Sequence, residues 1–255
     1  MKILSLREVS DLKKPAPYSY TLGSGKQKLF MFGAVHFRDA DDPQFVTMKD
    51  MWREFMALKG AKIALVESGV GSFRSTFEGS VASSREEGAT QWLAFQEGMG
   101  ILCADLEFVE MLKHLSEKFE SNDIAYWVIS REMFNRIRNP GGRSAEDVLL
   151  TNLARYRRAF KEIGVDTDRT WFDTKHTEMF GPQSIDDDDF WKKLASWSAP
   201  KVFNDIIEFE SRLRNERIYS VIEHLWKLGR SIFVTYGATH AVQLEPALHA
   251  MVEGK

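Results

Sequence analysis

Short runs of apolar residues recur along the chain, and glycine or charged residues bound each of them. Runs of this length that are rich in β-branched and aromatic side chains predict strands buried on both faces. The chain contains four of them, at 29–32, 62–66, 125–130 and 231–236. A fifth run at 18–22 is joined to the one at 29–32 by a glycine-rich turn, so we expect an N-terminal β-hairpin.

Stretches with apolar residues three and four positions apart lie between these runs and predict amphipathic helices. The first follows Asp42 and Pro43, which suit a helix cap and first turn, and ends near Gly60. Other helices are expected at 104–119, 144–163, 201–228 and through 244–251, with Pro246 in the first turns of the last. Because a strand–helix–strand unit is a right-handed crossover, its strands should be parallel. We therefore expect a single α/β domain over residues 1–255, with a largely parallel central sheet flanked by helices.

Two polar stretches interrupt this pattern. Residues 70–100 hold many Gly, Ser and charged residues, and a loop of that length would be unusual. We expect a flap or short helices there, close to a functional site. The four aspartates at 186–189 lack the spacing of a calcium loop, and the helix dipole favours a solvated helix start.

Composition limits the classes of partner and the chemistry of the chain. A formal net charge of −3 gives no electrostatic reason to expect nucleic acid or a membrane surface. No apolar stretch approaches the roughly 20 residues of a membrane helix, and the N-terminus becomes polar too soon for a signal peptide, so we expect a cytoplasmic protein. The single cysteine, Cys103, excludes an intrachain disulfide, and its apolar neighbours predict a buried, inert thiol.

The phrase Gly-Ala-x-His occurs twice, each time at the end of a predicted strand. The run at 29–32 leads to His36, and the run at 231–236 leads to His240. The run at 62–66 delivers Glu67 in the same way. Since open α/β sheets bind ligands at the carboxyl ends of their strands, we expect these three side chains to converge on one site.

Arg214 lies on the apolar side of the long helix predicted at 201–228. Its neighbours on that line are Ile207, Ile218, Val221 and Leu225. An isolated buried charge is costly, so the guanidinium needs a partner. Two interpretations stay open: a structural ion pair, for which Glu210 is a candidate, or an arginine that reaches the site and stabilises a carboxylate or an oxyanion.

Two imidazoles and a carboxylate suit a divalent metal that keeps one position open for water. The same groups can act without a metal, with a histidine as general base, Glu67 orienting it or the other histidine, and Arg214 stabilising an oxyanion. Both routes lead to hydrolysis. The expected catalytic residues are therefore His36, Glu67, Arg214 and His240, and the expected ligands of a metal are His36, Glu67 and His240.

In their order along the chain, these motifs resemble those of the superfamily that joins TraB, Tiki, erythromycin esterase and ChaN-like proteins. The matching residues are Gly33-Ala-Val-His36, Glu67 in Leu-Val-Glu-Ser-Gly, the pair Arg214-Asn215, and Gly237-Ala-Thr-His240. The resemblance implies an erythromycin esterase/ChaN-like α/β fold with a cleft lined by both Gly-x-x-His motifs. It also implies metal-dependent proteolysis, as in Tiki, or ester hydrolysis, as in the esterase branch.

We therefore expect a hydrolase that acts on a peptide or small-molecule ester, assisted by a divalent ion such as Mn, Co or Zn. Asn215 and Tyr236 are the expected substrate-binding residues. The rival hypothesis, from the ChaN-like branch, is a non-enzymatic protein that binds haem or a similar planar ligand through a histidine and either Tyr236 or nearby aromatic residues. A degenerate enzyme kept as an interaction module is disfavoured, because all four key residues are present. The sequence leaves open whether the chain forms a homo-oligomer.

Overall fold

The computed structural model describes residues 2–67, 69, 74–138, 141–196 and 198–254, which form two compact units. Unit 1 comprises Met1–Asp105 and Arg212–Lys255, and unit 2 comprises Leu106–Ser211. Unit 1 has the α/β fold that the sequence predicts, whereas the described part of unit 2 is helical. A single domain across the whole chain stays a prediction.

The central sheet of unit 1 has five strands in the order β1-β2-β5-β3-β4. They are β1 (Tyr18–Leu22), β2 (Leu29–Ala34), β3 (Lys62–Val66), β4 (Ile101–Cys103) and β5 (Ser231–Gly237). β1 is antiparallel to β2, and the other neighbours are parallel. The predicted hairpin and the largely parallel sheet are thus confirmed. A short helix that was not predicted, α1 (Leu6–Leu12), precedes the hairpin.

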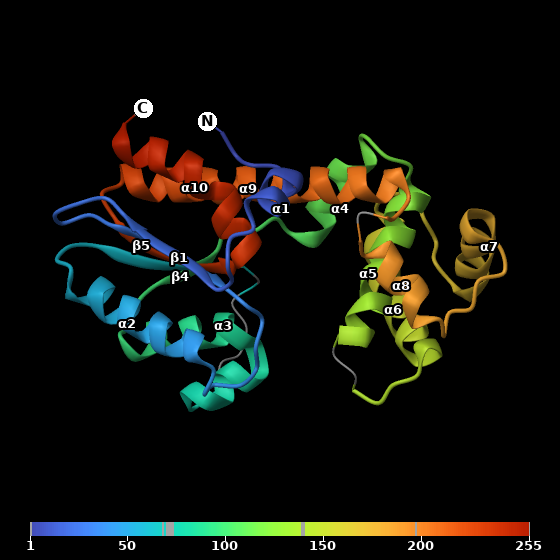
Figure 1. Ribbon diagram of the computed structural model, residues 1–255, viewed down its shortest axis with the longest axis horizontal. Coiled ribbons are helices and arrows are strands. Elements are labelled where there is room, and N and C mark those ends of the chain that lie inside the picture. The colour runs from blue at the N-terminus through green and yellow to red at the C-terminus, as the bar shows by residue number, and fades with distance from the viewer. Residues whose placement is uncertain (1, 68, 70–73, 139–140, 197, 255) are drawn as a thin grey trace. The chain divides into compact units, whose positions relative to one another are not determined.

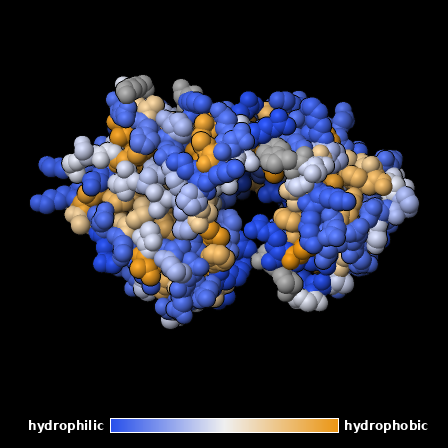
Figure 2. Space-filling view, in the orientation of Figure 1, coloured by the Kyte–Doolittle hydropathy of each residue, from blue (hydrophilic) through white to orange (hydrophobic). Residues whose placement is uncertain are grey.

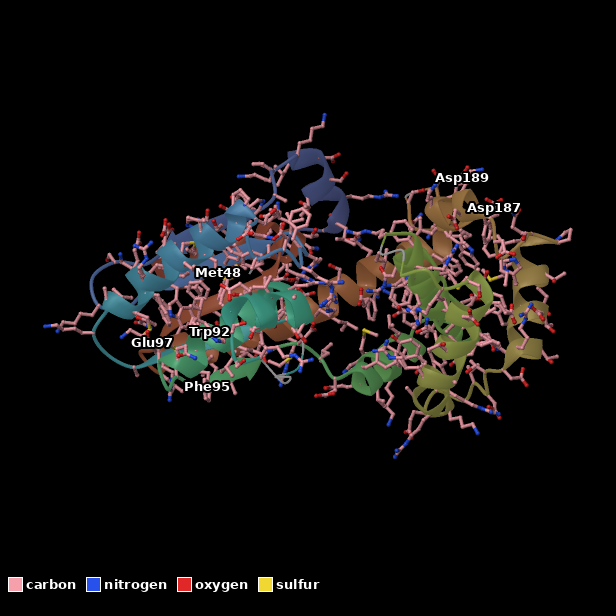
Figure 3. The ribbon with its side chains drawn as sticks, turned by 90° about the horizontal axis from the view of Figure 1, so that it is seen from below. Met48, Trp92, Phe95, Glu97, Asp187 and Asp189 are labelled. Atoms are coloured by element: carbon pink, nitrogen blue, oxygen red, sulfur yellow. The ribbon has the colours of Figure 1, made fainter. Side chains whose placement is uncertain are left out.

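Helices cover both faces of this sheet (Figure 1). One layer contains α2 (Pro43–Ala57) and α3 (Phe77–Gln96), and the other contains α9 (Lys201–Lys227), which begins in unit 2, and α10 (Ala238–Glu253). Because strand side chains alternate between faces, Phe30 packs in the α2–α3 layer and Met31 in the α9–α10 layer. Figure 3 labels two members of the α2–α3 layer, Met48 and Trp92. Burial on both faces explains why β2, β3 and β5 are continuous apolar runs.

One predicted strand is wrong. Residues 125–130 belong to α5 (Ser121–Arg138), in which every residue from Ile124 to Ser130 is buried. A helix that is buried all round gives the same uninterrupted apolar run as a buried strand, so periodicity alone cannot separate them. The helix predicted at 104–119 is shorter than expected, α4 (Phe108–Ser116), and the strand β4 that precedes it was not predicted.

Three further expectations are corrected or refined. Cys103 is exposed rather than buried, since β4 is an edge strand of the sheet. Pro246 lies in the middle of α10, because that helix begins at Ala238. In the stretch 70–100, residues 70–73 lie outside the described residues, and α3 consists of two helical segments merged across a kink at Ser84 and Arg85, in line with the predicted short helices.

Unit 2 has its own hydrophobic core, formed by helices. Besides α4 and α5 they are α6 (Ala145–Lys161), α7 (Arg169–Phe180), α8 (Asp188–Leu194) and the start of α9. The predicted solvated helix start is confirmed: Asp187 caps α8 by accepting from two backbone N–H groups, and Figure 3 labels Asp187 and Asp189 there. At the centre of the core, the buried Tyr126 hydroxyl bonds His176 Nδ1 at 2.5 Å. This polar pair is satisfied inside an aromatic core.

None of the described helices is both long and apolar enough to cross a membrane. On the face drawn in Figure 2, hydrophilic residues dominate and apolar ones form small separate patches.

Gly33, in the first Gly-Ala-x-His motif, lies where α10 crosses β2. A Cβ atom there would lie 2.4 Å from the Tyr18 carbonyl oxygen and 2.7 Å from Ala241 Cβ. We predict that Gly33→Ala lowers the free energy of unfolding by about 1–3 kcal/mol, because backbone atoms must shift to admit the methyl group. Gly100→Ala is the matched control, since nothing lies within 4 Å of a Cβ at that position. Urea denaturation of both variants checks this, and equal stabilities would contradict it.

Candidate functional site

The candidate site lies at the edge of the sheet where the four parallel strands β2, β3, β4 and β5 end. His36 follows β2, Glu67 follows β3, Asp105 follows β4, and His240 lies in the first turn of α10 directly after β5. His240 Nε2 is 3.7 Å from Glu67 Oε1. A Cβ atom at Gly237 would lie 3.3 Å from His36 Nε2 and 3.5 Å from Glu67 Oε2, so these groups border the same small volume. The structure therefore brings together the three residues that the sequence predicts to converge.

Glu67 is the centre of the hydrogen bonding. Its Oε1 accepts from the Arg214 guanidinium at 2.8 Å, and its Oε2 accepts from the Gly237 backbone N–H at 2.8 Å. Burial by itself raises the pKa of Glu67, but the charges of His240 and Arg214 and the Gly237 bond outweigh it and lower that pKa to about 2. The carboxylate is ionised at neutral pH. Its contribution to stability is present above the ordinary glutamate pKa and is lost as the pH falls towards 2.

Arg214 is held by a second carboxylate, Asp105. Its Nε lies 3.0 and 2.9 Å from the two Asp105 oxygens, and both side chains are largely buried. The structural ion pair considered for Arg214 therefore exists, but with Asp105 and Glu67. Glu210 instead pairs with Arg131, at 3.2 Å. Sequence reasoning missed Asp105 because the helix predicted at 104–119 included it, and the three-residue strand before it was not predicted.

His36 is oriented by Glu86, a residue that sequence reasoning also missed. His36 Nδ1 is 2.6 Å from Glu86 Oε1, and Glu86 is only 1% exposed. The hydrogen bond to Glu86 raises the pKa of His36, against the opposing effect of burial. Because the carboxylate accepts from Nδ1–H, the lone pair of the neutral ring lies on Nε2, the nitrogen that faces Gly237 and Glu67.

The kink in α3 places Glu86 beside His36. Arg85 has a φ of 56°, a left-handed conformation that is rare for a residue with a side chain. The two helical segments approach so closely that a Cβ atom at Gly88 would lie 2.1 Å from the Ser80 carbonyl oxygen. Beyond the kink, the Thr90 hydroxyl bonds the Thr235 hydroxyl of β5 at 2.8 Å. The only sequence signal for Glu86 is its position in the polar stretch expected near the site.

Asn215 and Tyr236 are buried and both contact His240. His240 Nδ1 lies 2.8 Å from Asn215 Oδ1, and Asn215 is fully buried. Tyr236 is also fully buried, with its ring edge-on to His240 and its pKa raised by burial. Direct contact of either side chain with a substrate stays a prediction. The haem hypothesis also stays a prediction.

His36, Glu67 and His240 are also the predicted ligands of a divalent metal. Within the described residues, no group of three or more His, Cys, Asp and Glu side chains is suited to hold a metal ion. Each Glu67 oxygen already accepts one hydrogen bond, from Arg214 or from the Gly237 N–H. The requirement for a divalent ion stays a prediction.

Comparison of the chain with protein-family models, with curated proteins and with solved structures finds no match. The resemblance to the TraB and Tiki superfamily therefore stays a prediction from short motifs.

We predict that Arg214→Lys lowers the free energy of unfolding by roughly 1–3 kcal/mol, the cost of leaving buried acceptors without donors. A lysine ammonium cannot reproduce the planar set of donors that spans Asp105 and Glu67. The control is Arg212→Lys on the same helix, because Arg212 forms an exposed ion pair with Glu216 that contributes little. Thermal unfolding of both variants at pH 7 tests this prediction. An unchanged melting temperature in Arg214→Lys would show that the contacts of Arg214 with Asp105 and Glu67 are dispensable for stability.

Proposed function

We propose that this site hydrolyses a peptide or ester bond, with His36 as the general base. The supporting observation is the His36–Glu86 pair: a buried carboxylate fixes Nδ1, and Nε2 faces the volume bordered by Gly237 and Glu67. A histidine that is fixed at one nitrogen and presents the other to the reacting group is suited to take a proton from water.

In this mechanism His36 Nε2 takes a proton from a water molecule while the water oxygen bonds to the carbonyl carbon. The resulting oxyanion accepts hydrogen bonds from backbone N–H groups at the start of α10, since the first N–H groups of a helix have no partner within it. Ala238 and Thr239 supply them, and neither is buried. The proton then passes to the leaving nitrogen or oxygen, the carbon–nitrogen or carbon–oxygen bond breaks, and a carboxylic acid results.

Glu67 and Arg214 set the charge of the site in this proposal. The Glu67 carboxylate favours the protonated forms of His36 and His240, which arise during proton transfer. Arg214 contacts two carboxylates, so its charge is already balanced by Asp105 and Glu67. We therefore assign Arg214 to holding Glu67 in place rather than to the oxyanion.

The test is an activity screen of the purified protein on peptides and esters. We expect His36→Gln to lose at least about a hundredfold in kcat for any substrate that the wild type hydrolyses, the usual contribution of a general base. The control is His249→Gln, which changes a histidine that stacks on Tyr20 at the other end of α10. Unchanged turnover in His36→Gln would overturn the proposal. Parallel assays with a chelator test the metal requirement, and a Soret band on haem addition would favour the rival hypothesis.

The pH dependence provides a second prediction. Activity needs neutral His36, so the rate should rise with pH through an inflection above the ordinary histidine pKa, because Glu86 raises the pKa of His36. In Glu86→Gln the raising charge is gone, and the inflection should move to lower pH while kcat falls. Glu87→Gln, at the next position, is the matched control. A pH–rate profile that is identical in Glu86→Gln and the wild type would contradict the assignment.

A further inference from the structure

A chain of buried hydrogen bonds connects His240 to the backbone of the N-terminal segment. His240 Nδ1 lies 2.8 Å from Asn215 Oδ1, and Asn215 Nδ2 donates to Gln243 Oε1 at 2.9 Å. Gln243 Nε2 donates to the Leu4 carbonyl oxygen at 3.1 Å. Asn215 and Gln243 are at most 1% exposed. The chain therefore links α9, α10 and the segment before α1 beneath the candidate site.

The direction of every bond in this chain follows from its last member. A backbone carbonyl can only accept, so the amide group of Gln243 must donate to Leu4 and its oxygen must face Asn215. Asn215 must then donate its amide hydrogen to Gln243 and turn its own oxygen to His240. Consequently His240 Nδ1 carries a hydrogen. The Leu4 N–H donates to the Gln243 carbonyl at 3.0 Å, which holds the end of the chain in place.

The hydrogen-bond chain places the hydrogen of neutral His240 on Nδ1, whereas the nearby Glu67 carboxylate favours it on Nε2. His240 Nε2 lies 3.7 Å from Glu67 Oε1, and a carboxylate favours a ring with its hydrogen on Nε2. A neutral His240 without the chain would place its single hydrogen there. With the chain in place, the neutral ring keeps its hydrogen on Nδ1 and turns a lone pair towards the site.

We propose that Gln243 is a positioning residue that acts through Asn215 to hold neutral His240 in the Nδ1–H tautomer, so that Nε2 is the only ring nitrogen that exchanges a proton with the site. This inference deepens the proposed hydrolase function, in which His240 takes part in proton transfer. Its structural part, the tautomer, does not depend on that function.

The primary test is the tautomer of His240, read from the ¹⁵N chemical shifts of its ring in the protein without substrate, at a pH where the ring is neutral. The wild type should show hydrogen on Nδ1. Gln243→Met has a similar length but no amide, so Asn215 is free to turn its amide hydrogens to His240. We expect this variant to shift towards the Nε2–H tautomer. A Gln243→Met protein that keeps the wild-type shifts would overturn the proposal.

Two further variants separate positioning from a general loss of structure. Glu245 lies on the same helix and accepts a hydrogen bond from the Tyr18 hydroxyl instead. The Glu245→Gln variant should therefore keep the wild-type tautomer of His240. Asn215→Asp keeps an acceptor for Nδ1–H without the chain, and it should keep that tautomer even in combination with Gln243→Met. If the combined variant shows the Nε2–H tautomer, the chain does not act through the acceptor at position 215, and the proposal fails.

The readout in catalysis is a fall in kcat of about 10–100-fold in Gln243→Met with little change in KM, the usual cost of losing a partner that orients a functional histidine. The double variant Asn215→Asp/Gln243→Met should recover part of that loss. If the tautomer changes as expected and no substrate is hydrolysed even by the wild type, the proposed function fails while the role of Gln243 stands. If the wild type is active and the tautomer does not change in Gln243→Met, the role of Gln243 fails while the proposed function stands.

Discussion

The site depends on one buried carboxylate, that of Glu67. Its two oxygens accept from Arg214 on α9 and from the Gly237 N–H, where β5 passes into α10. Through Arg214 it is also connected to Asp105 at the end of β4. Buried charges are tolerated only when they are paired and hydrogen-bonded, so the ends of these elements must stay in register around Glu67. The same bonds keep the carboxylate ionised beside two histidines.

Each histidine of the site is fixed from its side away from Glu67. His36 is held by the Glu86 carboxylate, and His240 is held by the Asn215 amide. The two supports differ in kind: a negative charge raises the basicity of His36, whereas a neutral amide orients His240 without adding charge. The site therefore has two imidazoles with different electrostatic environments, which suits a reaction in which one group takes up a proton and another releases it.

The elements that carry these supports could not all be read from the sequence. The strands β2, β3 and β5 were predictable because burial on both faces imposes a continuous apolar run, and a residue after such a strand lies at the carboxyl edge by topology. β4 has only three residues, two of them exposed, so it gives no such run. The α5 helix gives a strand-like run because it is buried all round. The position of Asp105 was therefore missed, and α5 was assigned wrongly.

The sequence by itself determined the largely parallel sheet, the N-terminal hairpin, and the placement of His36, Glu67 and His240 at strand ends, while it left two interpretations open for Arg214. These follow from local periodicity and chain direction, which a single sequence records. Only the tertiary structure decided the partners: Glu86 for His36 across a kink in α3, Asp105 for Arg214, and Gln243 with Leu4 behind Asn215 and His240. Each partner is distant in sequence or set by a side-chain rotation. Hydrogen bonds between such groups form only when packing has fixed both ends, so no spacing along the chain encodes them.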